Sequence, residues 1–176
     1  MVDIYRFYPS DTDLRKLLET HSRMVAEMAL EVARKHPELR ADEEFIYEAS
    51  MLHDIGVSEC NAPDIHCHGT EPYICHGVIG SRRLREAGLP RHAAVCERHT
   101  GSGLTCEEIV SHHLPLPRRD MLPVSIEEKI ICYADKFYSK SGDITHRKSL
   151  SSVIKGMARH GRKPLERFLA LHRELC

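Results

Sequence analysis

The sequence predicts an all-α fold on three observations. Apolar residues recur every three or four positions along most of the 176-residue chain, which is the spacing of one helix face. Capping residues, glycines and prolines separate these segments at helix-length intervals. The alternation of apolar and polar residues that is typical of strands is missing from the sequence. We therefore expect one compact helical bundle over residues 1–176, with a core at about 14–138 and C-terminal helices at about 149–175.

The individual helices follow from this spacing and from their end signals. They are expected at about 13–35, 42–55, 74–87, 90–99, 105–113, 125–138, 149–160 and 164–175. In the first helix His21 falls on the apolar stripe, and a break near Thr20 is an alternative to a continuous helix. In the second, His53 follows a core-facing alanine by four residues and therefore also faces the core. Gly56 is expected to end this helix in the left-handed conformation.

Two further segments matter for the site. Residues 57–73 are polar and rich in glycine, proline and histidine, which predicts a loop. Ser125 and Glu128 form a capping-box pattern, which predicts a helix start. That helix places Asp135 beside its apolar face, four residues after a buried isoleucine.

The composition is that of a soluble globular protein, with 41% hydrophobic residues, 29% charged residues and a net charge of -1. Apolar runs stay well below the roughly 20 residues that span a bilayer, and the first residues lack the layout of a signal peptide. We therefore expect a cytoplasmic protein without a membrane partner. The seven cysteines form no paired framework, so we expect no disulfides.

The last part of the chain is basic, since residues 140–176 hold nine Lys and Arg against three Asp and Glu. A basic region attracts phosphates or nucleic acid. This one lacks an RNA-binding signature and interleaved aromatic residues, which favours a solvated helix face over a nucleic-acid surface. The expected partner is therefore a small molecule, and the oligomeric state stays open.

Histidine is unusually abundant, with 13 in a chain that has no Trp and four Phe. Histidine is the commonest metal ligand in proteins. Three predicted helices bring His21, the adjacent His53 and Asp54, and Asp135 to the core side. A buried carboxylate without a partner costs several kcal/mol, and a divalent cation would satisfy two imidazoles and two carboxylates together. The sequence therefore predicts a metal site in the core.

These residues also resemble a known family. Their order is H…HD…D, and residues 53–56 read HDIG, as in the HD-domain metal-dependent phosphohydrolases. The resemblance covers about residues 14–138 and implies a helical bundle with a metal site in its core. It implies that His21, His53, Asp54 and Asp135 hold the first metal ion.

The resemblance extends to a second metal. The segments CHGVIG at 75–80 and RHTG at 98–101 are similar to the second-metal histidines of small bacterial HD hydrolases that cleave dinucleoside polyphosphates. It implies that Asp54 bridges two ions and that His76 and His99 complete the second site. One or two divalent ions per chain are therefore expected, with iron or manganese favoured over magnesium, zinc or nickel.

The implied activity is that of a metal-dependent phosphohydrolase acting on a nucleotide or another phosphate ester by attack of a metal-bound hydroxide. Asp54 is expected to orient that hydroxide. Cations must neutralise the phosphoryl oxygens in the transition state. Arg83, seven residues after His76 on one helix face, and Lys136, next to Asp135, are candidates for this catalytic role, with Arg98 as a third.

Two other functional classes fit the same ligands: a di-iron HD-domain oxygenase, and a non-catalytic sensor that binds a metal or a nucleotide. A structural zinc site is a further alternative for the cysteines and histidines of one loop, although they form no CxxC pair. These residues are Cys60, His66, Cys67, His68 and Cys75. His112 and His113, at a predicted helix end, are kept outside the main ligand set.

Overall fold

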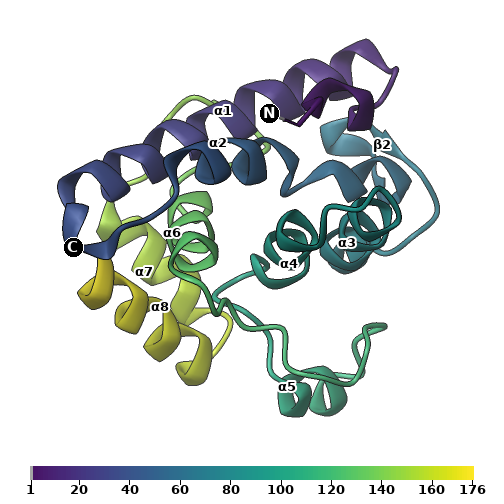
Figure 1. Ribbon diagram of the computed structural model, residues 1–176. Helices are drawn as coiled ribbons and strands as arrows, with labels where there is room; N and C mark the ends of the chain where they lie inside the picture. Colours follow the sequence, from purple (N-terminus) through teal and green to yellow (C-terminus); the bar gives the residue numbers. More distant parts are fainter. Residues whose placement is uncertain (1) are drawn as a thin grey trace.

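The computed structural model describes residues 2–176, and in this part of the chain helices dominate (Figure 1). The all-α fold class is therefore confirmed. The α-helices in the described range are α1 (Thr12–Lys35), α2 (Glu43–Leu52), α3 (His76–Glu86), α4 (Pro90–Arg98), α5 (Cys106–Ser111), α6 (Ile126–Asp135), α7 (Leu150–Ala158) and α8 (Arg162–Leu175). Short 3-10 helices precede or join them: η1 (Ile4–Phe7), η2 (Pro37–Leu39), η3 (Ile55–Glu59), η4 (Pro63–Ile65) and η5 (Tyr73–Cys75).

The longest helix, α1, runs along one side of the molecule and packs on α2 and α6 (Figure 1). Asp11 caps its start by accepting hydrogen bonds from the backbone N–H groups of Asp13 and Leu14. The helix is continuous through Thr20, so the alternative of a break there is wrong. The physical reason is that the apolar stripe continues on both sides of this position.

Two apolar cores lie along α1. Its N-terminal half, with Leu18, packs with η1, α3, α4 and the end of α2. Its C-terminal half, with Val25, packs with α2, α6, α7 and α8. His21 lies between Leu18 and Val25 and is fully buried. The predicted metal site therefore lies where the two cores meet.

The segment predicted as a loop at 57–73 contains more regular structure than expected. It includes the antiparallel strands β1 (Asn61–Ala62) and β2 (Cys67–His68), in which Asn61 pairs with His68. Strands of two residues are too short to leave an alternating pattern in the sequence. This small sheet is the only one within residues 2–176.

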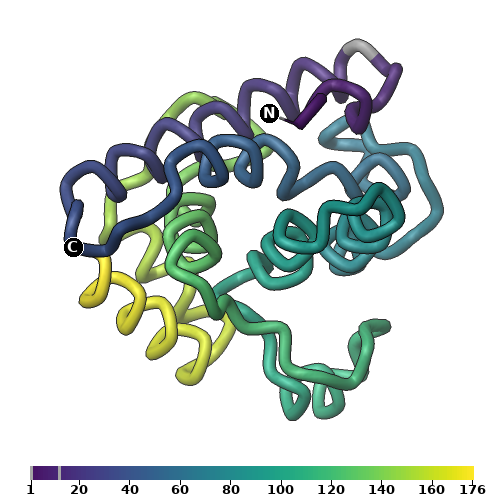
Figure 2. The backbone as a smooth tube through the Cα atoms, in the orientation of Figure 1, coloured from purple at the N-terminus to yellow at the C-terminus, as the bar shows by residue number. Residues whose placement is uncertain are grey.

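The chain between α4 and α6 leaves the helical body as an arm that carries α5 and then returns (Figure 2). An isolated bridge between Leu104 and Met121 joins its two sides. A full capping box, formed by Thr105 and Glu108, starts α5. None of the described helices combines the length and the apolar character needed to cross a membrane.

Gly56 has a different role from the one predicted. It does not end a helix in the left-handed conformation, because α2 ends at Leu52 and Gly56 lies within η3 without a positive φ. Instead, η3 packs so closely on α3 that a Cβ atom at Gly56 would lie 2.1 Å from the carbonyl oxygen of His76. Only glycine allows this approach, which brings the start of α3 beside Asp54.

We expect Gly56→Ala to lower the free energy of unfolding by about 3 kcal/mol, since a backbone group rather than a flexible side chain blocks the new methyl group. Urea unfolding measures this change. Gly156→Ala is the matched control, because Gly156 lies inside α7 with open space around it and alanine there should stabilise the helix by about 0.5–1 kcal/mol. Equal stability of Gly56→Ala and the wild type would disprove the close-packing role.

Candidate metal centre

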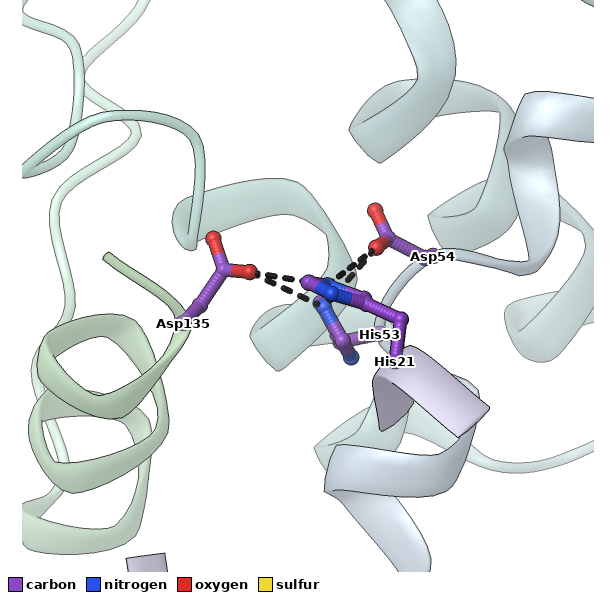
Figure 3. A group of neighbouring side chains, drawn as sticks. All are labelled: His21, His53, Asp54 and Asp135. Atoms are coloured by element: carbon purple, nitrogen blue, oxygen red, sulfur yellow. Dashed lines mark hydrogen bonds and ion pairs between the residues drawn. The ribbon is translucent and has the colours of Figure 1, made fainter. Parts of the chain in front are cut away.

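Two groups of buried metal-ligand side chains meet at the junction of the two cores. The first is His21, His53, Asp54 and Asp135, whose side chains converge in Figure 3. The second is Asp54, His76 and His99. Within each group the ligand atoms lie within 4.8 Å of one another. The structure thus brings together all six residues predicted as metal ligands, and Asp54 is common to both groups.

Helix ends supply almost all of these side chains. His53 follows the last residue of α2, His76 begins α3, His99 follows α4, and Asp135 ends α6. Asp54 leaves the helical conformation, with φ -110° and ψ 6°. This turn directs the adjacent side chains of His53 and Asp54 toward one point. Two consecutive residues inside a helix point about 100° apart and could not both face one ion.

The first group is tightly packed (Figure 3). The Nε2 atom of His21 lies 3.1 Å from Oδ1 of Asp135 and 3.2 Å from Oδ2 of Asp54. The Nε2 atom of His53 lies 2.9 Å from the same Asp54 oxygen and 3.5 Å from the same Asp135 oxygen. Two imidazole nitrogens and two carboxylate oxygens therefore surround one small space.

The tautomers of three histidines are set by the backbone. Each of them places Nδ1 against a carbonyl oxygen three residues earlier, and a carbonyl can only accept, so Nδ1 carries the proton. In the neutral form of each histidine, Nε2 is then left with a lone pair that faces the site. The contacts are His53 to Ser50 at 2.6 Å, His76 to Tyr73 at 2.7 Å, and His99 to Cys96 at 2.8 Å.

A direct consequence concerns His76 and His99, whose Nε2 atoms lie 3.1 Å apart. With both Nδ1 atoms protonated, the Nε2 lone pairs of the two histidines face each other. Oδ1 of Asp54 is a further acceptor, 3.5 Å from Nε2 of His76 and 3.3 Å from Nε2 of His99. Lone pairs this close repel unless a cation lies among them.

Two buried polar atoms of the centre, Nδ1 of His21 and Oδ1 of Asp54, lack a hydrogen-bond partner among the described residues, while Oδ2 of Asp54 faces the Nε2 atoms of His21 and His53 and the ammonium group of Lys140. Native proteins rarely leave such atoms unsatisfied. Imidazole nitrogen and carboxylate oxygen are suitable ligands for first-row divalent metals. The two groups therefore fit divalent metal ions, while the identity of the metal and its ligands stay predictions.

The charge states suit such a role. Burial alone would raise the pKa of Asp54, but His53 and Lys140 lower it well below its ordinary value. Burial opposes ionisation of Asp135 too, and the nearby lysines lower its pKa well below the ordinary range. Burial lowers the pKa of His76 to about 3 and also lowers that of His99. The carboxylates are therefore charged, and these two histidines are neutral.

His53 behaves differently because it faces both carboxylates. Burial lowers its pKa, but Asp54 and Asp135 outweigh burial and raise the pKa to about 9. The same negative charge that attracts a proton to Nε2 also attracts a metal ion, so proton and metal compete for this nitrogen.

Two lysines lie beside the ligand carboxylates. Nζ of Lys136 is 2.7 Å from Oδ2 of Asp135 and donates to the carbonyl oxygen of His99 at 3.3 Å. Nζ of Lys140 is 2.6 Å from Oδ2 of Asp54. Sequence reasoning missed Lys140, because it lies in the irregular segment after α6, where spacing does not predict side-chain position.

The comparisons with known proteins agree with this geometry. The sequence pattern of the HD domain matches residues 18–139, a range that contains every residue of both ligand groups. The chain belongs to the HD-domain family. No solved structure gave a significant match.

Relatives of this HD domain include proteins with and without a described activity. An uncharacterized protein of Methanocaldococcus jannaschii is 38% identical over 77% of this chain and 72% of its own length. A tRNA (cytidine(56)-2'-O)-methyltransferase of Thermoplasma volcanium is 30% identical over 98% of this chain, and one of Picrophilus torridus is 32% identical over 70% of it. The matched regions span 44% and 32% of those two enzymes, so each is much longer than the HD domain.

The two ligand groups together are called the HD centre. Neither of the two predicted arginines bonds to it. The guanidinium of Arg83 donates to the carbonyl oxygens of Ile55 and Phe7, both at 2.8 Å, and to Oγ of Ser58 at 3.2 Å. Helical spacing correctly places Arg83 on the His76 side of α3, but its long side chain crosses to η3 and the N-terminal segment. Nη1 of Arg98 donates to both carboxylate oxygens of Glu128, at 3.1 Å and 2.9 Å. Their contacts give no support to the expected phosphoryl role.

Arg83→Ala is therefore expected to act on stability. It would leave two carbonyl acceptors of η3 and the N-terminal segment without their charged donor, lowering the free energy of unfolding by about 2–4 kcal/mol. Chemical denaturation of the variant measures this loss. Arg82→Ala on the same helix is the control, because its pair with Glu59 is exposed and worth at most about 1 kcal/mol. If Arg83→Ala is as stable as the wild type, the bonds of Arg83 to Ile55 and Phe7 do not stabilise the fold.

The other metal candidates stay outside the centre. His112 and His113 are exposed at the end of α5. The thiols of Cys60 and Cys67 donate to backbone carbonyls, and burial raises their pKa to about 12 and about 11. Beyond the two HD groups, residues 2–176 contain no further cluster of three metal-ligand side chains, which argues against a zinc site in this loop.

A cavity of about 890 Å³ adjoins the HD centre. Asp135, Lys136 and Lys140 lie on its wall together with Tyr73, and α7 contributes further wall residues. Asp135 is the single carboxylate among the described lining residues, whereas basic side chains are numerous. They are Lys136, Lys140, His146, Arg147, Lys148, Arg159 and His160.

Proposed function

We propose that this HD-domain protein is a metal-dependent phosphohydrolase whose substrate is a nucleotide or another small phosphate ester. The observation that carries the proposal is the charge arrangement at the edge of the cavity. Asp54 and Asp135 are each paired with a lysine ammonium group, at 2.6 Å and 2.7 Å. A divalent ion among the ligands would supply Lewis acidity and a water molecule of lowered pKa.

The charge balance favours an anionic substrate. The two carboxylates are already neutralised by Lys136 and Lys140, so one or two divalent cations leave the centre with excess positive charge. A phosphoryl group restores neutrality, whereas an uncharged substrate does not. This is the main support for phosphate-ester hydrolysis over oxygenation of a neutral molecule.

The residues of the chain have distinct roles in this proposal. Asp54 joins the two ligand groups and fixes their relative position. His76 and His99, held by backbone carbonyls, keep their Nε2 lone pairs directed at the second site. Lys136, fixed between Asp135 and the carbonyl of His99, presents its remaining N–H donor toward a phosphoryl oxygen.

The cavity supports a substrate larger than phosphate itself. Its volume of about 890 Å³ is within the range of small-molecule sites. Tyr73 and Tyr138 on its wall offer aromatic surface on which a base can stack. The similarity to parts of two tRNA-modifying enzymes makes an RNA phosphate a second substrate class for testing.

A substrate screen tests the proposal. The protein is incubated with Mn²⁺, Fe²⁺ or Mg²⁺ and with nucleotides, dinucleoside polyphosphates and short RNAs carrying a terminal phosphate. Released phosphate or nucleotide is measured. We expect turnover of at least one phosphate ester and competitive inhibition by inorganic phosphate. Metal binding without turnover of any phosphate ester would favour the sensor class.

A further inference from the structure

Lys140 reaches the HD centre from outside the regular structure. It lies in residues 136–149, the connection between α6 and α7, yet its side chain is only 14% exposed. Its ammonium group contacts Oδ2 of Asp54, an oxygen that also faces Nε2 of His53 at 2.9 Å and of His21 at 3.2 Å. One carboxylate oxygen is thus shared by a fixed cation and by two nitrogens of the first ligand group.

This shared oxygen creates a conflict of charge. A divalent ion held by the first ligand group would bind at Asp54 Oδ2, the same atom that pairs with Lys140. Two cations on one carboxylate oxygen repel each other strongly in a buried site. Lys136 does not share this conflict, since it pairs with Oδ2 of Asp135, whereas His21 and His53 face Oδ1.

Lys140 has room to change partner. Its connection is closed by a hydrogen bond from the N–H of Lys148 to the carbonyl oxygen of Phe137 at 2.8 Å. Between these residues, the side-chain bond of Thr145 to Asp143 stays within the connection, whereas Arg147 donates to Glu31 of α1 at 2.9 Å. Lys140 also lines the cavity beside the ligands, so its ammonium group lies next to the space in which an anion would bind.

We infer that Lys140 exchanges Asp54 for an oxygen of the substrate's phosphoryl group when metal and substrate are bound, which couples the binding of the two. Lys140 is then a catalytic residue that contacts substrate. The inference rests on the proposed function. Because Lys140 occupies the Asp54 oxygen that faces the first ligand group, it weakens metal binding in the absence of an anion. An anion that takes Lys140 as its partner restores metal binding, and by reciprocity the metal strengthens anion binding.

The test is the affinity for Mn²⁺ with and without inorganic phosphate, measured from the electron paramagnetic resonance signal of free Mn²⁺. For the wild type we expect phosphate to lower the apparent Kd for Mn²⁺ by about tenfold. Lys140→Met is expected to bind Mn²⁺ about tenfold more tightly than the wild type without phosphate and to lose most of the phosphate effect.

Two further variants make the test specific. Lys140→Arg keeps the charge and should keep the phosphate effect, which also guards against misfolding of the methionine variant. Lys155→Met, at an exposed position on α7, should match the wild type in both measurements. Weaker or unchanged Mn²⁺ binding by Lys140→Met, with the phosphate effect intact, would overturn the inference.

The same data separate the two proposals. If the wild type binds no Mn²⁺ and hydrolyses no phosphate ester with Mn²⁺, Fe²⁺ or Mg²⁺, the proposed function fails. If it binds Mn²⁺ and hydrolyses a phosphate ester while Lys140→Met behaves like the wild type, only the role of Lys140 fails.

Discussion

Replacing Asp54 with asparagine is expected to lower kcat by about 10³-fold or more and to reduce the bound divalent metal below one ion per chain. Asp54 is the one residue common to both ligand groups, and its two oxygens face different histidines. The amide has nearly the same shape but carries no charge, so it weakens both sites together. His53→Ala should likewise remove the first site while leaving the helical content largely intact.

Elemental analysis and steady-state kinetics on the purified variants measure these effects, and circular dichroism reports the helical content. Asp64→Asn is the matched control, since Asp64 is an exposed aspartate on η4 outside both groups. Full metal content together with normal turnover in Asp54→Asn would show that the centre is not the active site.

The second large effect is expected from His99→Gln, which should lower the metal content from two ions to one and reduce kcat by about 10²-fold. His99 supplies an imidazole to the second group only, with its Nε2 atom 3.3 Å from Oδ1 of Asp54. The substrate affinity should change less than kcat, because a second ion would act mainly on transition-state charge.

His92→Gln on α4, the helix that His99 follows, is the control for loss of a buried histidine. His92 is buried and contacts Glu48 rather than the centre. It should therefore lose stability but keep both ions. An unchanged metal content in His99→Gln would mean that His76 and His99 do not hold a metal.

The helical fold and the inward positions of His21, His53 and Asp135 could be predicted because local patterns determine them. His21 keeps the apolar spacing of α1, and the same periodicity places His53 inward near the end of α2. Ser125 caps α6 as expected, and Asp135 ends it. Each of these features depends on residues within a few positions along the chain, which sequence periodicity and capping describe directly.

Other features depend on contacts between distant segments, and spacing does not describe them. Gly56 matters because α3 packs against it, which no neighbouring residue signals. Arg83 lies on the expected helix face, but the length of its side chain lets it bind distant carbonyls instead. Lys140 follows the end of α6, beyond the reach of helical periodicity, and its approach to Asp54 depends on the path of the connection.

The capping box predicted at Ser125 shows the same limit on a smaller scale. Ser125 accepts from the N–H of Glu128 as expected. The Glu128 carboxylate, however, binds Arg98 of α4 and the N–H of Val124. A tertiary ion pair has thus taken the place of half of the local motif.

The most direct test of the central claim is hydrolysis in ¹⁸O-labelled water by the Mn²⁺-loaded protein without oxygen, with mass spectrometry of the products. If the HD centre catalyses attack of water on phosphorus, each hydrolysed ester yields a phosphoryl product carrying one ¹⁸O atom from the solvent, and the Asp54→Asn variant yields none above background. Turnover that requires O₂, or label found in the organic product instead of the phosphoryl group, would contradict the account.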